Sequence, residues 1–118
     1  MAPASGAPAT RLTRRAEFLL VASKGRKAPA PGLVLQALAR ADQAPARLGF
    51  TVTKKVGNAV VRNRTRRRLR AAARAVLLET PVHGVDLVLI GRDGTRGRPF
   101  RLLLDDLRRA LGKVGALP

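Results

Sequence analysis

The sequence predicts a single α+β domain, a two-layer α/β sandwich in which three helices pack on a sheet of at least three strands. Two patterns predict it: three segments have the apolar spacing of amphipathic helices, and three others are extended apolar runs. The expected order is helix, strand, strand, helix, strand, helix, at residues 13–24, 33–40, 48–56, 59–78, 85–90 and 99–114. With 118 residues, 46% of them hydrophobic, the chain can form one domain with its own core.

The first ten residues contain neither a charged nor an aromatic side chain, and we expect a flexible tail there. The predicted domain then covers residues 11–114, and residues 115–118 form a short C-terminal tail. The N-terminal segment has no apolar signal-peptide region. A transit peptide is the alternative, but only ten residues precede the domain.

In the first helix, we expect the following side chains to spread around one side: Ala16, Phe18, Leu19, Ala22 and Ser23. Gly25 can end this helix. The next segment, Gly25 to Gly32, contains two prolines and two glycines that frame it, so no ordered element is expected.

Three apolar runs are candidate strands. The periodicity of Leu33 to Arg40 suits a helix or a strand, and the short length, with Gly32 before it and Pro45 beyond it, favours a strand. Leu48 to Val56 alternates and is rich in β-branched residues, which favours a strand. Val85 to Ile90 is almost continuously apolar, as in a buried strand.

The central helix is predicted from Ala59 to about Leu78, with Asn58 as its N-terminal cap. A helical wheel puts one stripe against the core: Val61, Thr65, Leu69, Ala72 and Val76. The opposite side carries Asn63, Arg67, Arg70 and Arg74.

The last helix begins at Pro99, and its apolar residues follow i, i+3, i+4, i+7 spacing, which predicts a core-facing stripe. The stripe is Phe100, Leu103, Leu104, Leu107, Leu111 and Val114. Before it, the basic, glycine-rich segment from Gly91 to Pro99 is expected to be a loop. It can contact phosphate or be solvated, and the sequence leaves both open.

Positive charge is the strongest functional signal. The formal net charge is +17, from 24 Lys and Arg against 7 Asp and Glu, and no acidic residue lies between Asp42 and Glu79. A merely solvated helix face usually mixes signs, whereas Lys54 to Arg74 carries only cations, so this stretch is typical of a phosphate-binding surface. The chain has no cysteine and no apolar run of transmembrane length, which suits a cytoplasmic protein.

The order of residues from Phe50 to Arg67, FTVTKKVGNAVVRNRTRR, resembles the signature of the bacterial ribonuclease P protein component. The similarity extends to Arg11–Phe18, Leu33–Leu35 and Val85–Ile90, and covers about residues 11–111. The resemblance implies three helices on a four-stranded mixed sheet, related to domains in ribosomal protein S5 and elongation factor G, with a left-handed βαβ crossover around the Arg-rich helix.

The resemblance also implies a function. Proteins of this family join a catalytic RNA that removes the 5′ leader of precursor tRNA, so the expected partners are that RNA and precursor tRNA, with no DNA and no membrane. The Arg-rich helix is expected to face the catalytic RNA. The RNA-binding set expected on this basis is Lys54, Lys55, Asn58, Arg62, Asn63, Arg64, Arg66, Arg67, Arg70 and Arg74.

A cleft between the first helix, the sheet and the start of the Arg-rich helix is expected to hold the leader. The residues expected there are Arg14, Arg15, Phe18, Ala22, Gln36 and Phe50. Two of these depart from the family, which usually has an aromatic where this chain has Ala22 and often one where it has Gln36. Arg68 stands at a usually apolar position, and its stem is expected along the core with the guanidinium outside.

The sequence offers no catalytic constellation of its own. The only histidine, His83, is in a probable loop, and the scattered carboxylates do not suggest a pair of metal ions. We therefore expect the protein to bind no cofactor and the RNA to carry both catalysis and the Mg²⁺ requirement.

Three other function classes fit the sequence less well. A small basic ribosomal or other structural RNA-binding protein is the main alternative, but it would not be expected to carry this signature. A sequence-reading DNA-binding protein would need discriminating side chains on its recognition helix. A membrane-surface helix would need a stripe with larger apolar residues.

Overall fold

The computed structural model describes residues 9–117, and its centre is one mixed five-stranded sheet. The strands are β1 (Thr10–Arg11), β2 (Arg26–Pro29), β3 (Leu33–Ala39), β4 (Arg47–Val52) and β5 (Val85–Gly91). Their order across the sheet is β1-β4-β5-β3-β2. β4 is parallel to both β1 and β5, whereas β3 is antiparallel to both β5 and β2. The sheet is mixed as expected, with five strands in place of four.

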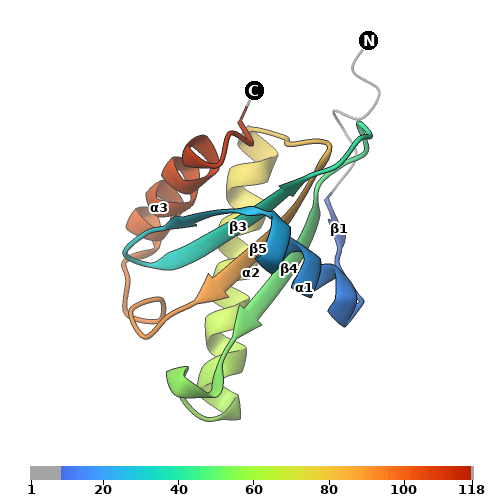
Figure 1. Cartoon of the computed structure of the whole chain (residues 1–118). Helices are drawn as coiled ribbons and strands as arrows, with labels where there is room; N and C mark the ends of the chain where they lie inside the picture. Colours follow the sequence, from blue (N-terminus) through green and yellow to red (C-terminus); the bar gives the residue numbers. More distant parts are fainter. Residues whose placement is uncertain (1–8, 118) are drawn as a thin grey trace.

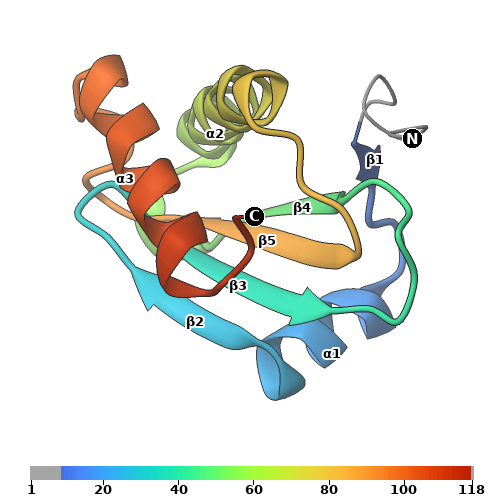
Figure 2. The same ribbon diagram turned by 90° about the horizontal axis from the view of Figure 1, so that it is seen from above.

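The helices are α1 (Arg15–Lys24), α2 (Ala59–Glu79) and α3 (Phe100–Lys113), with a short 3-10 helix, η1 (Lys54–Val56), before α2. Helices α2 and α3 cover one face of the sheet, and α1 lies on the other (Figure 2). Alternation along β5 explains how both faces become apolar: Leu87 and Leu89 belong to the α2 and α3 side, and Val88 to the α1 side. Of the two expected layers, one is the sheet and the other is formed by α2 and α3. Helix α1 adds a partial third layer on the opposite face of the sheet.

The adjacent parallel strands β4 and β5 are joined through η1 and α2. In Figure 1 both arrows point downward, β4 lies to the right of β5, and α2 passes behind the sheet. Figure 2 shows α2 on that same side. This path is a left-handed crossover, the rare hand for such a connection, as the family resemblance implies.

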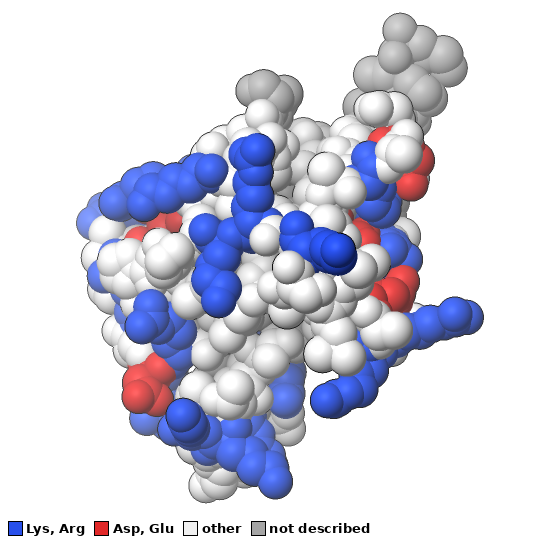
Figure 3. Space-filling model, in the orientation of Figure 1, with Lys and Arg blue, Asp and Glu red and all other residues white. Residues whose placement is uncertain are grey.

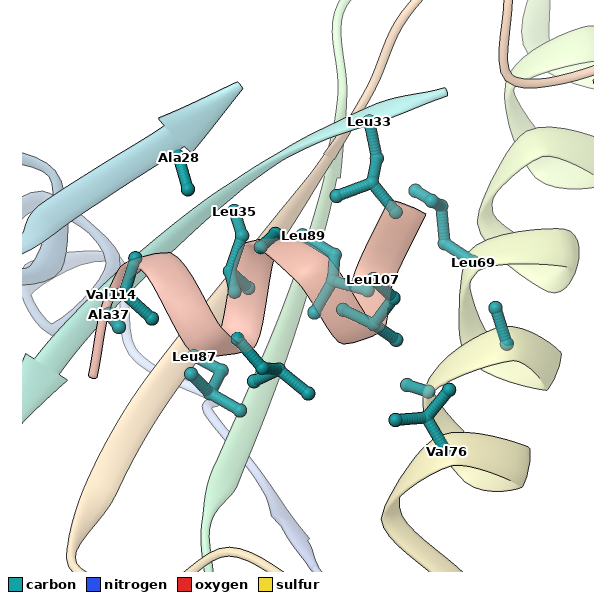
Figure 4. Close-up of a cluster of buried hydrophobic side chains, with 14 of the residues drawn as sticks. Ala28, Leu33, Leu35, Ala37, Leu69, Val76, Leu87, Leu89, Leu107 and Val114 are labelled. Carbon is teal, nitrogen blue, oxygen red and sulfur yellow. The ribbon is translucent and has the colours of Figure 1, made fainter. Parts of the chain in front are cut away.

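The main core fills the space between the sheet, α2 and α3 (Figure 4). Helix α2 contributes Leu69 and Val76 to it, and α3 contributes Leu107 and Leu111. The stripe predicted for α2 is confirmed at four of its five positions, because only Val61, in the first turn, remains half-buried. This packing fixes the rotation of α2, so its arginine-rich side is turned to solvent.

Helix α1 packs through a different residue from those expected. Val21 is fully buried in a second cluster with Leu12 and Val88, and Phe18 packs against that cluster. Leu19 is 55% exposed and Ala22 is also exposed, so the expected apolar side was wrong. A ten-residue helix on an open sheet face needs to bury only a narrow i, i+3 strip, and the apolar residues of α1 are too evenly spread to mark it.

Two boundaries in the sheet also differ from expectation. The proposed loop after α1 contains β2, where Ala28 is buried against the main core. β2 is an edge strand paired only with β3, and an edge strand tolerates Pro29 because one side of its backbone needs no partner. The strand expected to run to Val56 ends at Val52, and Lys54–Val56 form η1 instead.

The expected tails are shorter than predicted where the structure describes them. At the N-terminal end, Thr10 belongs to β1 and pairs with Arg47 of β4. At the C-terminal end, Gly115 turns the chain with a φ of 73°, and Ala116 and Leu117 then pack against the main core. Residues 1–8 and Pro118 lie outside the described residues.

Candidate nucleic-acid interface

The start of α2 is fixed by Gly57 and Asn58. Gly57 has a φ of 154°, and a Cβ there would come within 2.8 Å of a methyl group of Val61. The Asn58 side chain accepts a hydrogen bond of 3.0 Å from the Val61 backbone N–H, which confirms the predicted cap. The Gly-Asn pair of the signature therefore starts the helix, and contact of Asn58 with RNA stays a prediction.

The expected RNA-binding side chains form a largely exposed surface on η1 and α2. Those classed as exposed are Lys54, Lys55, Asn58, Asn63, Arg64, Arg67, Arg70 and Arg74. Arg62 and Arg66 are half-buried, and each donates a local hydrogen bond, to the Gly57 carbonyl at 2.9 Å and to Asn63 Oδ1 at 3.0 Å. The structure thus brings this set together on one helix and the turn before it.

No carboxylate among residues 9–117 forms an ion pair with an arginine of α2. Six of the seven acidic residues pair instead with Arg40, Arg47, Arg98 and Arg108, which lie outside α2. These six are Glu17, Asp42, Glu79, Asp86, Asp105 and Asp106. In Figure 3 Lys and Arg side chains gather at the lower end of the molecule, over η1 and the beginning of α2. The cations of α2 therefore remain available to an external polyanion.

Arg68 differs from the other arginines of α2. Its guanidinium donates to the Arg98 carbonyl and lies 5.7 Å from the centre of the Phe100 ring, while its Nε is buried with no hydrogen-bond partner among the described residues. We expected this guanidinium to point outside, and the structure instead shows it joining α2 to the start of α3. Arg68 therefore contributes more to helix packing than to the exposed surface.

On the opposite face of the sheet, Phe18 lies directly over Gly49. The edge of the Phe18 ring occupies the space that a Cβ at Gly49 would fill. The next residues along this face, Val34, Thr51 and Ile90, form a cross-strand row and are all half-buried. Beside α1 there is thus a partly open sheet surface bordered by one aromatic side chain.

The structure divides the expected leader-binding set between two faces. Arg15 and Ala22 are exposed on α1, and Arg14, which precedes the helix, is exposed as well. Phe50 is paired with Leu89 and packs against the main core, so it lies on the opposite face and was wrongly assigned to this site. Gln36 shares the α1 face with its partner Val88 but is only 8% exposed, so it offers little surface to a ligand.

A network of charged groups attaches α1 to the sheet. Glu17 accepts hydrogen bonds from the backbone N–H groups of Arg14 and Thr13, which lower its pKa, and also pairs with Arg47. Arg47 and Arg40 both donate to Asp86, which is only 4% exposed. Burial by itself would raise the pKa of Asp86, but these hydrogen bonds outweigh it and the pKa is lowered. Local sequence patterns do not reveal this network, because the partners in its ion pairs, Glu17–Arg47, Arg47–Asp86 and Arg40–Asp86, are separated by 30 to 46 positions.

The described residues contain no group of three or more His, Cys, Asp or Glu arranged to hold a metal ion. His83 is half-buried, and its backbone forms an isolated bridge with Pro45. None of the described helices has the length and apolar character needed to cross a membrane.

Comparison with known proteins assigns the family. The ribonuclease P family model matches residues 7–115. The chain is 74% identical over 107 residues to the ribonuclease P protein component of Gluconacetobacter diazotrophicus, covering 91% of this chain and 92% of the relative. It is 54% identical over 111 residues to that of Paramagnetospirillum magneticum, covering 91% and 84% of the two chains.

A solved structure agrees with this assignment. The ribonuclease P protein of Thermotoga maritima superimposes with a TM-score of 0.72 at 26% identity, covering 92% of this chain and 97% of that one. The shared fold includes the helix that carries the Arg-rich signature here. The chain therefore belongs to the ribonuclease P protein family and has the role of a protein subunit in the enzyme that matures the 5′ end of tRNA.

Proposed function

We propose that this subunit uses two faces: α2 with η1 binds the catalytic RNA, and the α1 face of the sheet binds the 5′ leader of precursor tRNA. The observation that carries the proposal is the segregation of charge, with the acidic residues paired to scaffold arginines and the arginines of α2 left unpaired among the described residues. Such a surface suits RNA phosphates, which are bound mainly through Lys and Arg.

The leader-binding half of the proposal is supported by Phe18 and its surroundings. Single-stranded RNA is commonly held by bases stacked on aromatic rings and by cations along its backbone. Phe18 is half-buried, and the exposed Arg14 and Arg15 lie about one turn before it. Lys54 and Lys55 follow the end of β4, the strand that contains Gly49 and Thr51. A leader on this face would meet one stacking platform and cations on both sides.

In this proposal the polypeptide binds the catalytic RNA and the leader, and the catalytic RNA cleaves precursor tRNA. Cleavage and its Mg²⁺ belong to the RNA, and the protein lowers the Mg²⁺ concentration needed because its net charge of +17 offsets repulsion between two polyanions. The site of action is the cytoplasm, where precursor tRNA is processed in a bacterial cell.

The test is cleavage of precursor tRNA at low Mg²⁺ by the catalytic RNA alone, the protein alone, and both together. We expect cleavage only with both, and none by the protein at any Mg²⁺ concentration. A matched control replaces the protein by polylysine at equal positive charge, which should not restore accurate cleavage. Cleavage by RNA-free protein at a comparable rate would show that the catalytic assignment is wrong.

A further inference from the structure

A hollow of about 580 Å³ lies on the sheet face away from α1, between α2 and the edge formed by β1 and β4. Its apolar walls include Leu48, Phe50, Ala73 and Leu77. Arg70 and Arg74, one helical turn apart, also line it. The volume is in the range of small-ligand sites, and its lining contains no acidic residue.

Phe50 makes this hollow suited to a planar group. The ring is half-buried, and the Arg70 guanidinium carbon lies 5.5 Å from its centre. An aromatic ring with a guanidinium beside it offers a stacking surface for a base and a cation for the phosphate attached to it. The same residue that sequence reasoning placed with the leader therefore has a distinct environment on the other face.

We propose that the hollow receives an unstacked base of the catalytic RNA, with Phe50 against the base and Arg70 and Arg74 on its flanking phosphates. The inference rests on the proposed function and adds a specific contact to it. The occupant follows from continuity: Arg70 and Arg74 belong to the exposed side of α2 that also carries Arg67, so RNA bound along this side passes the mouth of the hollow. Cations at the rim and apolar walls inside match a nucleotide, which has an anionic backbone and an uncharged base.

The chain permits a direct test, because it contains neither Trp nor Tyr. In the full-length Phe50→Trp variant, the single indole would report on the hollow by fluorescence. The matched control is Phe100→Trp, since Phe100 also lies beside an arginine, Arg68, but at the start of α3 and outside the lining of the hollow. Each variant is titrated with catalytic RNA and, separately, with precursor tRNA, with binding followed independently by filter retention.

We expect catalytic RNA to quench the emission of Phe50→Trp much more than that of Phe100→Trp, and precursor tRNA alone to have little effect on either. Phe50→Leu, which keeps an apolar side chain, should weaken binding of catalytic RNA about five- to a hundredfold, the usual range for a lost base stack, without changing the salt slope. Phe100→Leu should leave the affinity unchanged.

Four results would overturn the inference. Catalytic RNA that binds without selective quenching of Phe50→Trp, or Phe50→Leu with wild-type affinity, would exclude a base in the hollow while leaving the proposed function intact. A change in Phe50→Trp emission on deleting residues 2–8, with no quenching by RNA, would assign the hollow to the chain's own N-terminal segment. Failure of wild-type protein to bind catalytic RNA at all would refute the proposed function itself, and this inference with it.

Discussion

Phe18 packs directly on Gly49: the edge of the Phe18 ring fills the space where any other residue at position 49 would carry its Cβ. Gly49 is buried in β4, and Phe18 comes from the middle of α1. The absent side chain on the strand therefore sets the height of the aromatic ring above the sheet. In the proposed function this ring is the stacking platform for the leader.

The first prediction concerns Gly49→Ala. The added methyl group would overlap the Phe18 ring, which must tilt away from the sheet, and we expect a loss of about 1 to 3 kcal/mol in the free energy of unfolding. Urea denaturation followed by circular dichroism measures it. The control is Gly97→Ala, because no atom lies within 4 Å of a Cβ at position 97 and its stability should not fall. Equal stabilities for the two variants would show that the Phe18 ring is not held on Gly49.

The second prediction tests whether the leader passes α1 at position 22. Ala22 is exposed one turn after Phe18, so Ala22→Phe would add a second stacking surface without disturbing the core. We expect tighter binding of precursor tRNA that has a leader, by about 1 to 3 kcal/mol, with an almost unchanged salt slope, because stacking releases no counterions. The measurement is a salt series on the assembled enzyme, with a leaderless tRNA as control. An equal gain for both substrates, or no gain, would place the leader elsewhere.

The third prediction separates the two sides of α2. Arg64→Ala combined with Arg67→Ala removes two exposed cations that repel their neighbours, so the free protein should melt at or slightly above the wild-type temperature. The salt slope of RNA binding should fall by about 0.7 to 0.9 for each lost phosphate contact. Leu69→Ala opens a cavity at a fully buried position and should cost about 2 to 5 kcal/mol of stability. Thermal melts that rank these variants in reverse would contradict the orientation of the helix.

The fourth prediction concerns pH. Because the folded-state pKa of Asp86 is lowered, its charge stabilises the fold above the unfolded-state pKa of about 4, and this contribution is lost as pH falls through the folded-state value. Asp86→Asn should cost about 3 kcal/mol at pH 7, since it leaves Arg40 and Arg47 without their shared partner.

The difference between wild type and Asp86→Asn should shrink as the pH is lowered below about 4. Denaturant titrations from pH 7 down to pH 2 would follow it. Asp93→Asn, at an exposed loop position, is the control and should track wild type throughout. A difference that stays constant over this range would mean that the charge of Asp86 is not what stabilises the network.

Local signals were sufficient for much of the fold. Asn58 and the spacing of the apolar residues after it predicted α2 and its buried side, because a helix cap and an amphipathic pattern both depend only on residues close in sequence. Strand β2 was missed because it is stabilised by pairing with β3, and the β-propensity of its own residues does not reveal that pairing. For α1, Val21 could not be chosen over Leu19 without knowing which strands lay beneath the helix.

The site was predicted unevenly for the same reason. The cations of α2 share one helix, so their sequence spacing predicted their common surface. Phe50 was assigned to the wrong face because the alternation of β4 does not say which side α1 will cover. The hollow beside α2 combines distant segments, among them Leu48 and Leu77, and only the folded chain brings them together.

The unbalanced charge of α2 has an energetic consequence for the free protein. Its seven arginines repel one another within 21 residues, so folding without RNA carries an electrostatic cost. Added salt screens this repulsion and should raise the melting temperature of the isolated protein, although the same salt weakens its complex with RNA. Catalytic RNA that binds only the native protein then stabilises it, by an amount that grows with the logarithm of the RNA concentration relative to the dissociation constant. The subunit is therefore most stable when it is assembled, and the charge that makes it a good partner makes it a less stable monomer.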